Sequence, residues 1–309
     1  MFEIHFAPVQ GATDAPYRHF HATLYPEARL TYYTPFIRLE KGEIRKRDWN
    51  DAFPPLNDGC DLVPQVIFRD EQELSTLVAR LTDAGCRRID VNMGCPFPLQ
   101  TARGRGAATI ARPECAAALK AVVEAHPEVE FSVKMRLGLE DNREWEQLMP
   151  TLNSLPLRHV TLHPRVAKQQ YGGEVDLEAF AEFIAESKNP VIYNGDLRSP
   201  ADIQDIANRF PGIRGVMLGR GLLGRPSLAA EYAAGEEWQP EERIRRMLDF
   251  HRRLFTHYQE NLIGGDHQVL EKIKPFWEYA EAEIGRKPWK LIKKAQNLAK
   301  YHTAVASIP

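Results

Sequence analysis

The chain has 309 residues, of which 43% are hydrophobic and 27% charged, and its formal net charge is −2. This composition allows a large buried core and excludes a mostly disordered protein, while the small net charge excludes a global attraction to nucleic acid. The four cysteines include no CxxC pair, and no apolar run reaches the roughly 18 residues that would span a bilayer. We therefore expect a cytoplasmic protein with free thiols, without a signal peptide and without a membrane partner.

Short β-branched or apolar runs recur along the first three quarters of the chain, at the spacing of a strand–helix repeat. There are eight of them: Ile4–Pro8, Leu30–Thr34, Leu62–Ile67, Arg88–Met93, Phe131–Met135, His159–Leu162, Pro190–Tyr193 and Gly215–Leu218. Segments of helical period separate most of these runs, for example Glu71–Ala84 and Pro113–Ala125. This alternation predicts an α/β fold of the (β/α)8 TIM-barrel class. The alternative is a doubly wound sheet, which rarely contains eight units of such regular length.

The composition changes after Gly235, because no strand-like run follows Pro240 and only helical periods remain. We therefore predict a barrel domain over residues 1–235 and a helical domain over residues 236–309. The last 24 residues, 286–309, contain six basic and no acidic side chains. Three of these basic residues form one side of a predicted helix, here called the lysine face: Lys287, Lys290 and Lys294. By itself such a face is as consistent with solvated surface as with a contact to phosphates.

The carboxyl ends of the predicted strands carry most of the chemistry of this sequence. In a (β/α)8 barrel, the loops at these ends meet at one opening, where ligands bind. The segments at these ends are Pro8-Val9-Gln10, Gln65, Asn92 to Pro96, Lys134 to Arg136, His163 to Arg165, Asn194-Gly195-Asp196 and Gly219-Arg220-Gly221. His163 among them is either a donor to a ligand or a satisfied core histidine. We therefore predict one ligand site at this end of the barrel.

Some of these residues indicate the kind of ligand. Gly195 and the Gly219-Arg220-Gly221 segment favour a phosphate site, although the same glycines are also typical of ordinary tight turns. Lys134 is costly to bury unless it meets an anion or an electron-rich ring. Gln65 and Asn194 suit the imide edge of a flavin or a pyrimidine. The sequence has no HExxH pattern and no GxGxxG after its first strand, so we predict neither a metal site nor a dinucleotide-binding fold.

Cys95 is the most informative single residue. It follows Gly94 at a strand end, precedes Pro96, and leads into a loop with two arginines, Arg103-Gly104-Arg105-Gly106. No histidine lies beside it in the sequence, so a role as proton donor is at least as natural as a role as nucleophile. We interpret the other three cysteines as small buried hydrophobic residues.

These motifs match one known family, in order, along nearly the whole chain. The segment Asp90-Val91-Asn92-Met93-Gly94-Cys95-Pro96 resembles the active-site signature of the tRNA-dihydrouridine synthases. The resemblance also covers Ala7-Pro8, Thr13-Asp14, Pro16-Tyr17-Arg18, Val133 to Gly138, His163-x-Arg165, Gln169, Tyr171, Gly173, Asp176, Asn194-Gly195-Asp196, Gly219-Arg220-Gly221 and Lys272-Ile273-Lys274 with Trp277. The last of these is similar to the start of the family's helical tail.

The resemblance implies an enzyme that uses NADPH and FMN to reduce a uridine of tRNA to 5,6-dihydrouridine. Reduced flavin would deliver hydride to C6 of the uracil, and Cys95 would protonate C5 from the other face as a general acid. Asn92 and Arg165 match the positions that hold the uracil, which would be swung out of the folded RNA while the lysine face holds flanking phosphates. A monomer is expected. The FMN contacts would be Pro8, Val9, Gln10, Gln65, Lys134, His163, Asn194, Gly195, Asp196, Gly219 and Arg220.

The sequence departs from the family pattern at several positions. Val9 replaces the usual methionine, Val66-Ile67-Phe68 replaces a Leu-x-Gly segment, and Val166 and Leu177 replace a threonine and a tryptophan. The lysine that commonly follows the Cys-Pro pair is absent from Phe97-Pro98-Leu99-Gln100. These differences concern which uridine, and which RNA, is the substrate, and they leave the hydride transfer and the proton donor unchanged.

Two other functions remain open. The first is an FMN-dependent small-molecule ene-reductase or a dihydroorotate-dehydrogenase-like enzyme, which would use the same barrel but would not need the helical tail. The second is an inactive RNA-binding protein, which the presence of Cys95, Lys134 and Arg220 disfavours. Flavin absorbance of the purified protein would separate an enzyme from a protein that only binds RNA.

Overall fold

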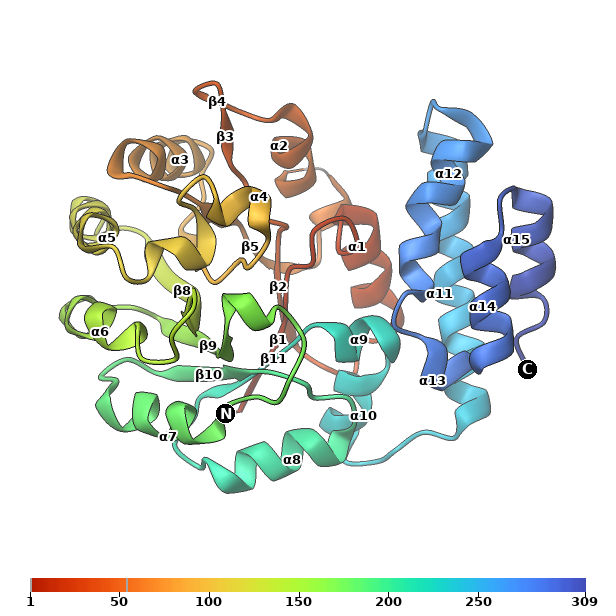
Figure 1. The fold of residues 1–309 in the computed structure, drawn as a ribbon. Coiled ribbons are helices and arrows are strands. Elements are labelled where there is room, and N and C mark those ends of the chain that lie inside the picture. Colours follow the sequence, from red (N-terminus) through yellow and green to blue (C-terminus); the bar gives the residue numbers. More distant parts are fainter. Residues whose placement is uncertain (1, 54) are drawn as a thin grey trace.

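The computed structural model describes residues 2–53 and 55–309 and contains a barrel of parallel strands surrounded by helices (Figure 1). Nine strands pair in the order β5-β2-β1-β11-β10-β9-β8-β7-β6. Their bounds are β1 Glu3–Phe6, β2 Leu30–Tyr33, β5 Asp61–Val63, β6 Gln65–Ile67, β7 Arg88–Met93, β8 Glu130–Gly138, β9 His159–Val166, β10 Val191–Asn194 and β11 Gly215–Leu218. The predicted (β/α)8 barrel class is confirmed.

The third predicted strand differs from the prediction, because residues 62–67 contribute to two strands instead of one. The break falls at Pro64, which has no N–H group to donate to a ladder. β5 pairs with β2 on one side of the break, and β6 pairs with β7 on the other. A bridge between Ile37 and Val66 adds a contact across this seam. The segment β5-Pro64-β6 therefore closes the barrel, and the sheet has nine strands where eight were predicted.

The outer helices follow the strands as predicted and cover the outside of the barrel (Figure 1). They are α1 Ala15–Leu24, α3 Glu71–Asp83, α5 Pro113–Ala125, α6 Trp145–Ser154, α7 Leu177–Glu186, α8 Pro200–Arg209 and α10 Leu228–Ala234. The start of α8 is fixed by a capping box, in which Ser199 and Asp202 satisfy each other's backbone N–H groups. Shorter elements lie at the carboxyl ends of the strands: the hairpin β3 Leu39–Glu40 and β4 Glu43–Ile44, and the helices α2 Lys46–Ala52, α4 Pro98–Thr101 and α9 Arg220–Gly224.

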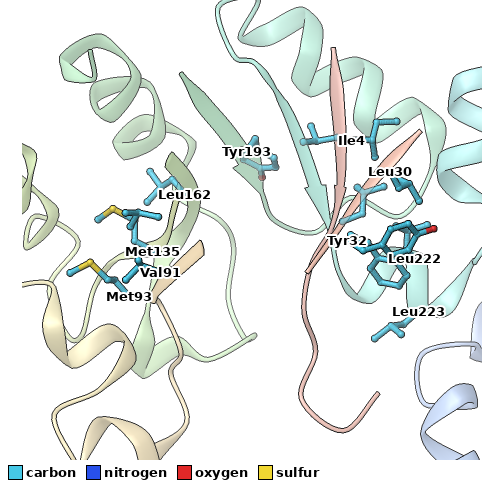
Figure 2. Packing of buried hydrophobic residues seen from close by; sticks show 14 of the residues in the cluster. Ile4, Leu30, Tyr32, Val91, Met93, Met135, Leu162, Tyr193, Leu222 and Leu223 are labelled. Atoms are coloured by element: carbon cyan, nitrogen blue, oxygen red, sulfur yellow. The ribbon is translucent and has the colours of Figure 1, made fainter. Parts of the chain in front are cut away.

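Strict alternation along the strands separates the core from the interior of the barrel. Outward-facing apolar side chains join the core that the helices share; Figure 2 shows Val91, Met135 and Leu162 together, from β7, β8 and β9. The residues between these positions face the other side of the sheet, because successive side chains of a strand point to opposite faces. On the same three strands these inward residues are polar: Asp90, Asn92, Ser132, Lys134, Arg136, Thr161, His163 and Arg165. The barrel interior therefore holds the chemistry-bearing residues.

The remaining chain forms helices beside the barrel, next to α1 (Figure 1). They are α11 Pro240–Asn261, α12 Gly265–Ile273, α13 Glu281–Ile284, α14 Arg286–Lys294 and α15 Leu298–Val305. The rings of Tyr17 on α1 and Phe250 on α11 lie 4.7 Å apart, and Lys272 forms an ion pair with Asp14 at 2.7 Å. A division at residue 235, between α10 and α11, stays a prediction. Among the residues described, no helix is long and apolar enough to cross a membrane.

Candidate active site

A cavity of about 500 Å³ opens at the carboxyl ends of the strands. Nearly all of the residues predicted for the site line it, although they come from seven different strand ends. They are Pro8, Val9, Gln10, Gln65, Asn92, Cys95, Lys134, His163, Asn194, Gly195, Asp196, Gly219 and Arg220. The structure therefore brings these side chains together, while their individual roles stay predictions.

Cys95 lies at the end of β7 in a backbone turn that its neighbours hold firmly. The side-chain oxygen of Asn92 accepts hydrogen bonds from the N–H groups of Gly94 and Cys95, at 3.1 and 2.9 Å. The carbonyl of Cys95 accepts a bond from the N–H of Ala107 at 3.1 Å. A side chain at Gly94 would come within 2.9 Å of the Met135 backbone, so this turn needs a glycine to pack against β8. These contacts therefore fix the backbone conformation of Cys95, whose thiol lines the cavity.

A chain of buried hydrogen bonds sets the orientation of Asn92. Asp90 accepts from the Ser132 hydroxyl at 2.5 Å and from Nε2 of Gln65 at 2.6 Å, and Oε1 of Gln65 accepts from Nδ2 of Asn92 at 2.8 Å. Because a carboxylate only accepts, it forces the Gln65 amide to donate to it, and this in turn directs the Asn92 oxygen towards Cys95. Sequence reasoning missed Asp90 and Ser132, although their inward positions on β7 and β8 were a usable signal.

The protonation of Asp90 and of Cys95 follows from their surroundings. Burial raises the pKa of Asp90 to about 6, against the hydrogen bonds from Ser132 and Gln65, so the carboxyl group is ionised at neutral pH. Burial also raises the pKa of the Cys95 thiol, and the Phe97 backbone N–H, Arg136 and Lys134 oppose this only in part. The thiol is therefore mostly protonated at neutral pH, which is the state that a proton donor needs.

Lys134 is a positively charged residue in the lining of the cavity. Its ammonium group makes no hydrogen bond or ion pair with any residue that the structure describes. Burial, with a smaller contribution from Arg136, lowers the pKa of Lys134 to about 8. A half-buried ammonium without a partner is stabilised by an anionic or electron-rich ligand in the cavity.

His163 is a neutral donor, and Arg165 sets its tautomer. Nη1 of Arg165 donates to Nε2 of His163 at 3.1 Å, so the proton of the neutral ring is on Nδ1. Burial, and then Arg136 and Lys134, keep the pKa of His163 well below its usual range. Arg165 is only 1% exposed, and it also donates to Asp196 at 2.5 Å and to the Gly173 carbonyl. It is not part of the cavity lining, so the structure places this predicted uracil contact where it supports His163 and Asp196.

Several contacts at the opening were not predicted, although Arg136, Tyr171 and Arg220 were named from the sequence. Arg136 donates to the carbonyls of Gly94, Val166 and Gln170 and thereby ties the Cys95 turn to the loop after β9. The guanidinium group of Arg220 lies 4.6 Å from the centre of the Tyr171 ring and also pairs with Asp196. Tyr279, from the helices after the barrel, lines the same cavity. These contacts join loops that are far apart in the sequence, so no local pattern indicated them.

The lysine face lies outside this cavity, on α14. Lys287, Lys290 and Lys294 are exposed, and within the described ranges none of them has an acidic partner. The neighbouring Lys293, in contrast, pairs with Glu278 at 3.1 Å. In the part of the chain that the structure describes, no group of three His, Cys, Asp or Glu residues could hold a metal ion.

The sequence comparisons with known proteins agree on one family, and a solved structure shares the fold. A family model described as dihydrouridine synthase (Dus) matches residues 5–303. The chain is 28% identical over 283 residues to a probable tRNA-dihydrouridine synthase of Rhodobacter capsulatus. This match covers 89% of this chain and 85% of that protein. It is 30% identical over 255 residues to one of Rhizobium leguminosarum, with 79% and 78% covered. Morphinone reductase shares the fold, with a TM-score of 0.54 at 11% identity over 77% of this chain and 87% of that chain.

Proposed function

Because the chain belongs to the dihydrouridine synthase family, we propose that it reduces a uridine of tRNA to 5,6-dihydrouridine, with bound FMN and with NADPH as reductant. The observation that carries this proposal is the position of Cys95. Its protonated thiol lines the same cavity as Lys134, Asn194 and Arg220, so one opening contains an acid and a set of flavin-type contacts.

The residues of the cavity fit FMN. Lys134 is a partly buried cation that has no partner among the described residues, which suits the electron-rich edge of an isoalloxazine ring. Nδ2 of Asn194 donates to the Met217 carbonyl at 2.6 Å, which leaves the amide oxygen as an acceptor. Gly195 and Gly219 leave their backbone free of side chains beside Arg220, as a phosphate site requires. When bound and reduced, FMN would supply the hydride that adds to C6 of the uracil.

The chain's own residues would supply the proton and the positioning. Cys95 would hold a proton on Sγ and transfer it to C5 of the uracil, because a thiol with a raised pKa stays protonated at neutral pH. Asn92 has one amide hydrogen left for the substrate, since its oxygen and its other hydrogen are used by the Cys95 turn and by Gln65. His163 would donate from Nδ1, and Arg165 would hold it in that tautomer.

The substrate would be an RNA because the helices of residues 236–309 lie beside the site and would bind the rest of the molecule. Residues 236–309 would form an RNA-binding unit next to a catalytic unit of residues 1–235. Tyr279 of this second unit lines the cavity, so the proposed RNA-binding helices reach the opening that contains Cys95. RNA bound on these helices would therefore have its target base next to the opening. A base within folded RNA must leave its stack to reach such a site.

The direct test is dihydrouridine formation on an unmodified tRNA transcript. We expect purified protein with FMN and NADPH to convert one or more uridines, detected by mass spectrometry of the digested RNA, and mapping in a deletion strain would identify the position. Omission of FMN from flavin-stripped protein should abolish the product. A protein that binds flavin and reduces a small enone, but never tRNA, would instead support the small-molecule reductase.

The lysine face offers a separate prediction about RNA binding. Changing Lys287, Lys290 and Lys294 to glutamate should weaken tRNA binding. The steepness with which the logarithm of the association constant falls with the logarithm of the salt concentration should decrease by about 2, because each lost phosphate contact reduces this slope by about 0.7–0.9. Filter binding between low and physiological salt would measure this. The control is the same change at three exposed cations on the barrel, away from α14: Arg80, Lys120 and Lys188. Equal salt slopes for the two triple variants would mean that the lysine face is only solvated surface.

A further inference from the structure

The opening of the cavity carries an unusual share of the exposed apolar surface. In the described part of the chain seven large apolar residues are exposed, and three aromatic ones among them line this cavity: Phe97, Tyr171 and Tyr279, at 55%, 51% and 39%. Leu99, at 62%, lies two residues beyond Phe97. Exposed apolar groups that gather at one site, and are not scattered singly, indicate a contact surface.

Phe97 stands on a rigid frame directly beside the candidate acid. It is two residues after Cys95 and is the N-cap residue of α4. Its carbonyl accepts from the N–H groups of Gln100 and Thr101, at 2.8 and 3.1 Å. Pro98, as the first residue of α4, restricts the backbone further. The ring is thus held in the lining of the cavity while more than half of Phe97 faces solvent.

We propose that the Phe97 ring stacks on the nucleobase next to the target uridine in the RNA. This inference rests on the proposed function, because a uridine within a polynucleotide brings its neighbours to the rim when it enters the cavity. An aromatic ring can stack on any base, since every base has a π face.

Charge at the same rim agrees with an RNA strand as the occupant. Arg38 and Arg47 line the cavity together with Phe97, and the Arg47 side chain is 67% exposed. Phosphates on either side of the stacked base would find these cations. The segment Phe97-Pro98-Leu99-Gln100 itself carries no charge, so the cations at this part of the rim come from other loops.

The test compares three substitutions at Phe97. We expect Phe97→Ala to raise KM for tRNA about tenfold, which is within the range measured for base stacking on aromatic residues, and to raise it by more than it lowers kcat. Phe97→Tyr should restore the wild-type KM, whereas Phe97→Leu, which is apolar but has no ring, should behave like alanine. Ile263, fully exposed and not part of the cavity, supplies the control, and Ile263→Ala should leave KM unchanged.

A binding measurement separates this inference from the proposed function. The probe is a fluorescein-labelled single-stranded RNA containing one uridine, titrated against flavin-loaded protein and followed by anisotropy. If the wild type forms dihydrouridine but Phe97→Ala binds the probe and turns over tRNA like the wild type, the inference fails and the function stands. In a second outcome, the wild type forms no dihydrouridine, but Phe97→Ala binds the RNA probe more weakly and Phe97→Tyr restores the affinity. The proposed function then fails and the stacking contact stands. A leucine variant equal to the wild type would overturn the requirement for an aromatic ring.

Discussion

Replacing Cys95 by alanine should lower dihydrouridine formation by about 10²–10⁴-fold, the usual contribution of a positioned general acid. The physical reason is that the hydride adds to only one carbon of the double bond, and the other carbon then needs a proton within reach. The variant should still bind FMN and oxidise NADPH, because the thiol is needed only to protonate the uracil. The measurements are dihydrouridine yield by mass spectrometry and NADPH oxidation by absorbance.

The controls for this prediction use the chain's other thiols and the pH. Cys86→Ala removes a half-buried thiol that lies before β7, at the opposite end of that strand from Cys95, and should retain full activity. Because burial raises the pKa of Cys95, its contribution in the wild type should persist through neutral pH and decline only above the thiol's ordinary value of 9.0. A Cys95→Ala enzyme with undiminished dihydrouridine yield would rule out this residue as the proton donor.

Gly106→Ala should be nearly as damaging, although Gly106 carries no functional group. Its φ is +62°, and an added Cβ would lie 2.6 Å from the Cys95 carbonyl oxygen and 2.8 Å from the Cys95 Cβ. The backbone of Cys95 must therefore move, and a displacement of about 1 Å at a reacting group costs about 10²-fold in rate. Steady-state kcat/KM for tRNA would report this loss.

The same loop provides a matched control in Gly104→Ala. Gly104 also has a positive φ, +72°, so both variants bear a similar backbone strain of about 1–2 kcal/mol. The Cβ at Gly104 would instead meet Nη1 of Arg112, the movable end of a long side chain, at 2.5 Å. Both variants should unfold at a lower temperature, and Gly106→Ala at the lower of the two because its Cβ meets backbone. Measured well below both unfolding temperatures, kcat/KM should fall much further for Gly106→Ala. Equal losses of activity would mean that loop strain, and not the position of Cys95, is the cause.

Much of the site was accessible from the sequence because strand ends are a local feature. Short apolar runs ended at or near Lys134, His163 and Asn194, and the barrel class then implied that these ends converge. Arg165 shows the limit of this reasoning. It matched a substrate-binding position, yet its two terminal nitrogens are engaged by His163, Gly173 and Asp196, so that role stays a prediction. A sequence position indicates which face of a strand a side chain is on, but not which residues of other strands are its hydrogen-bond partners in the folded protein.

The sequence by itself determined the alternation of strands and helices, the chemistry-bearing residues at the strand ends, and the cysteine motif. The tertiary structure alone decided the closure at Pro64 and the path of hydrogen bonds from Ser132 through Asp90 and Gln65 to the Cys95 turn. The reason is that propensity and periodicity are properties of neighbouring residues. Strand register and barrel closure, in contrast, are settled by all strands packing at once, and a shift of one residue would turn Asp90 out of the interior.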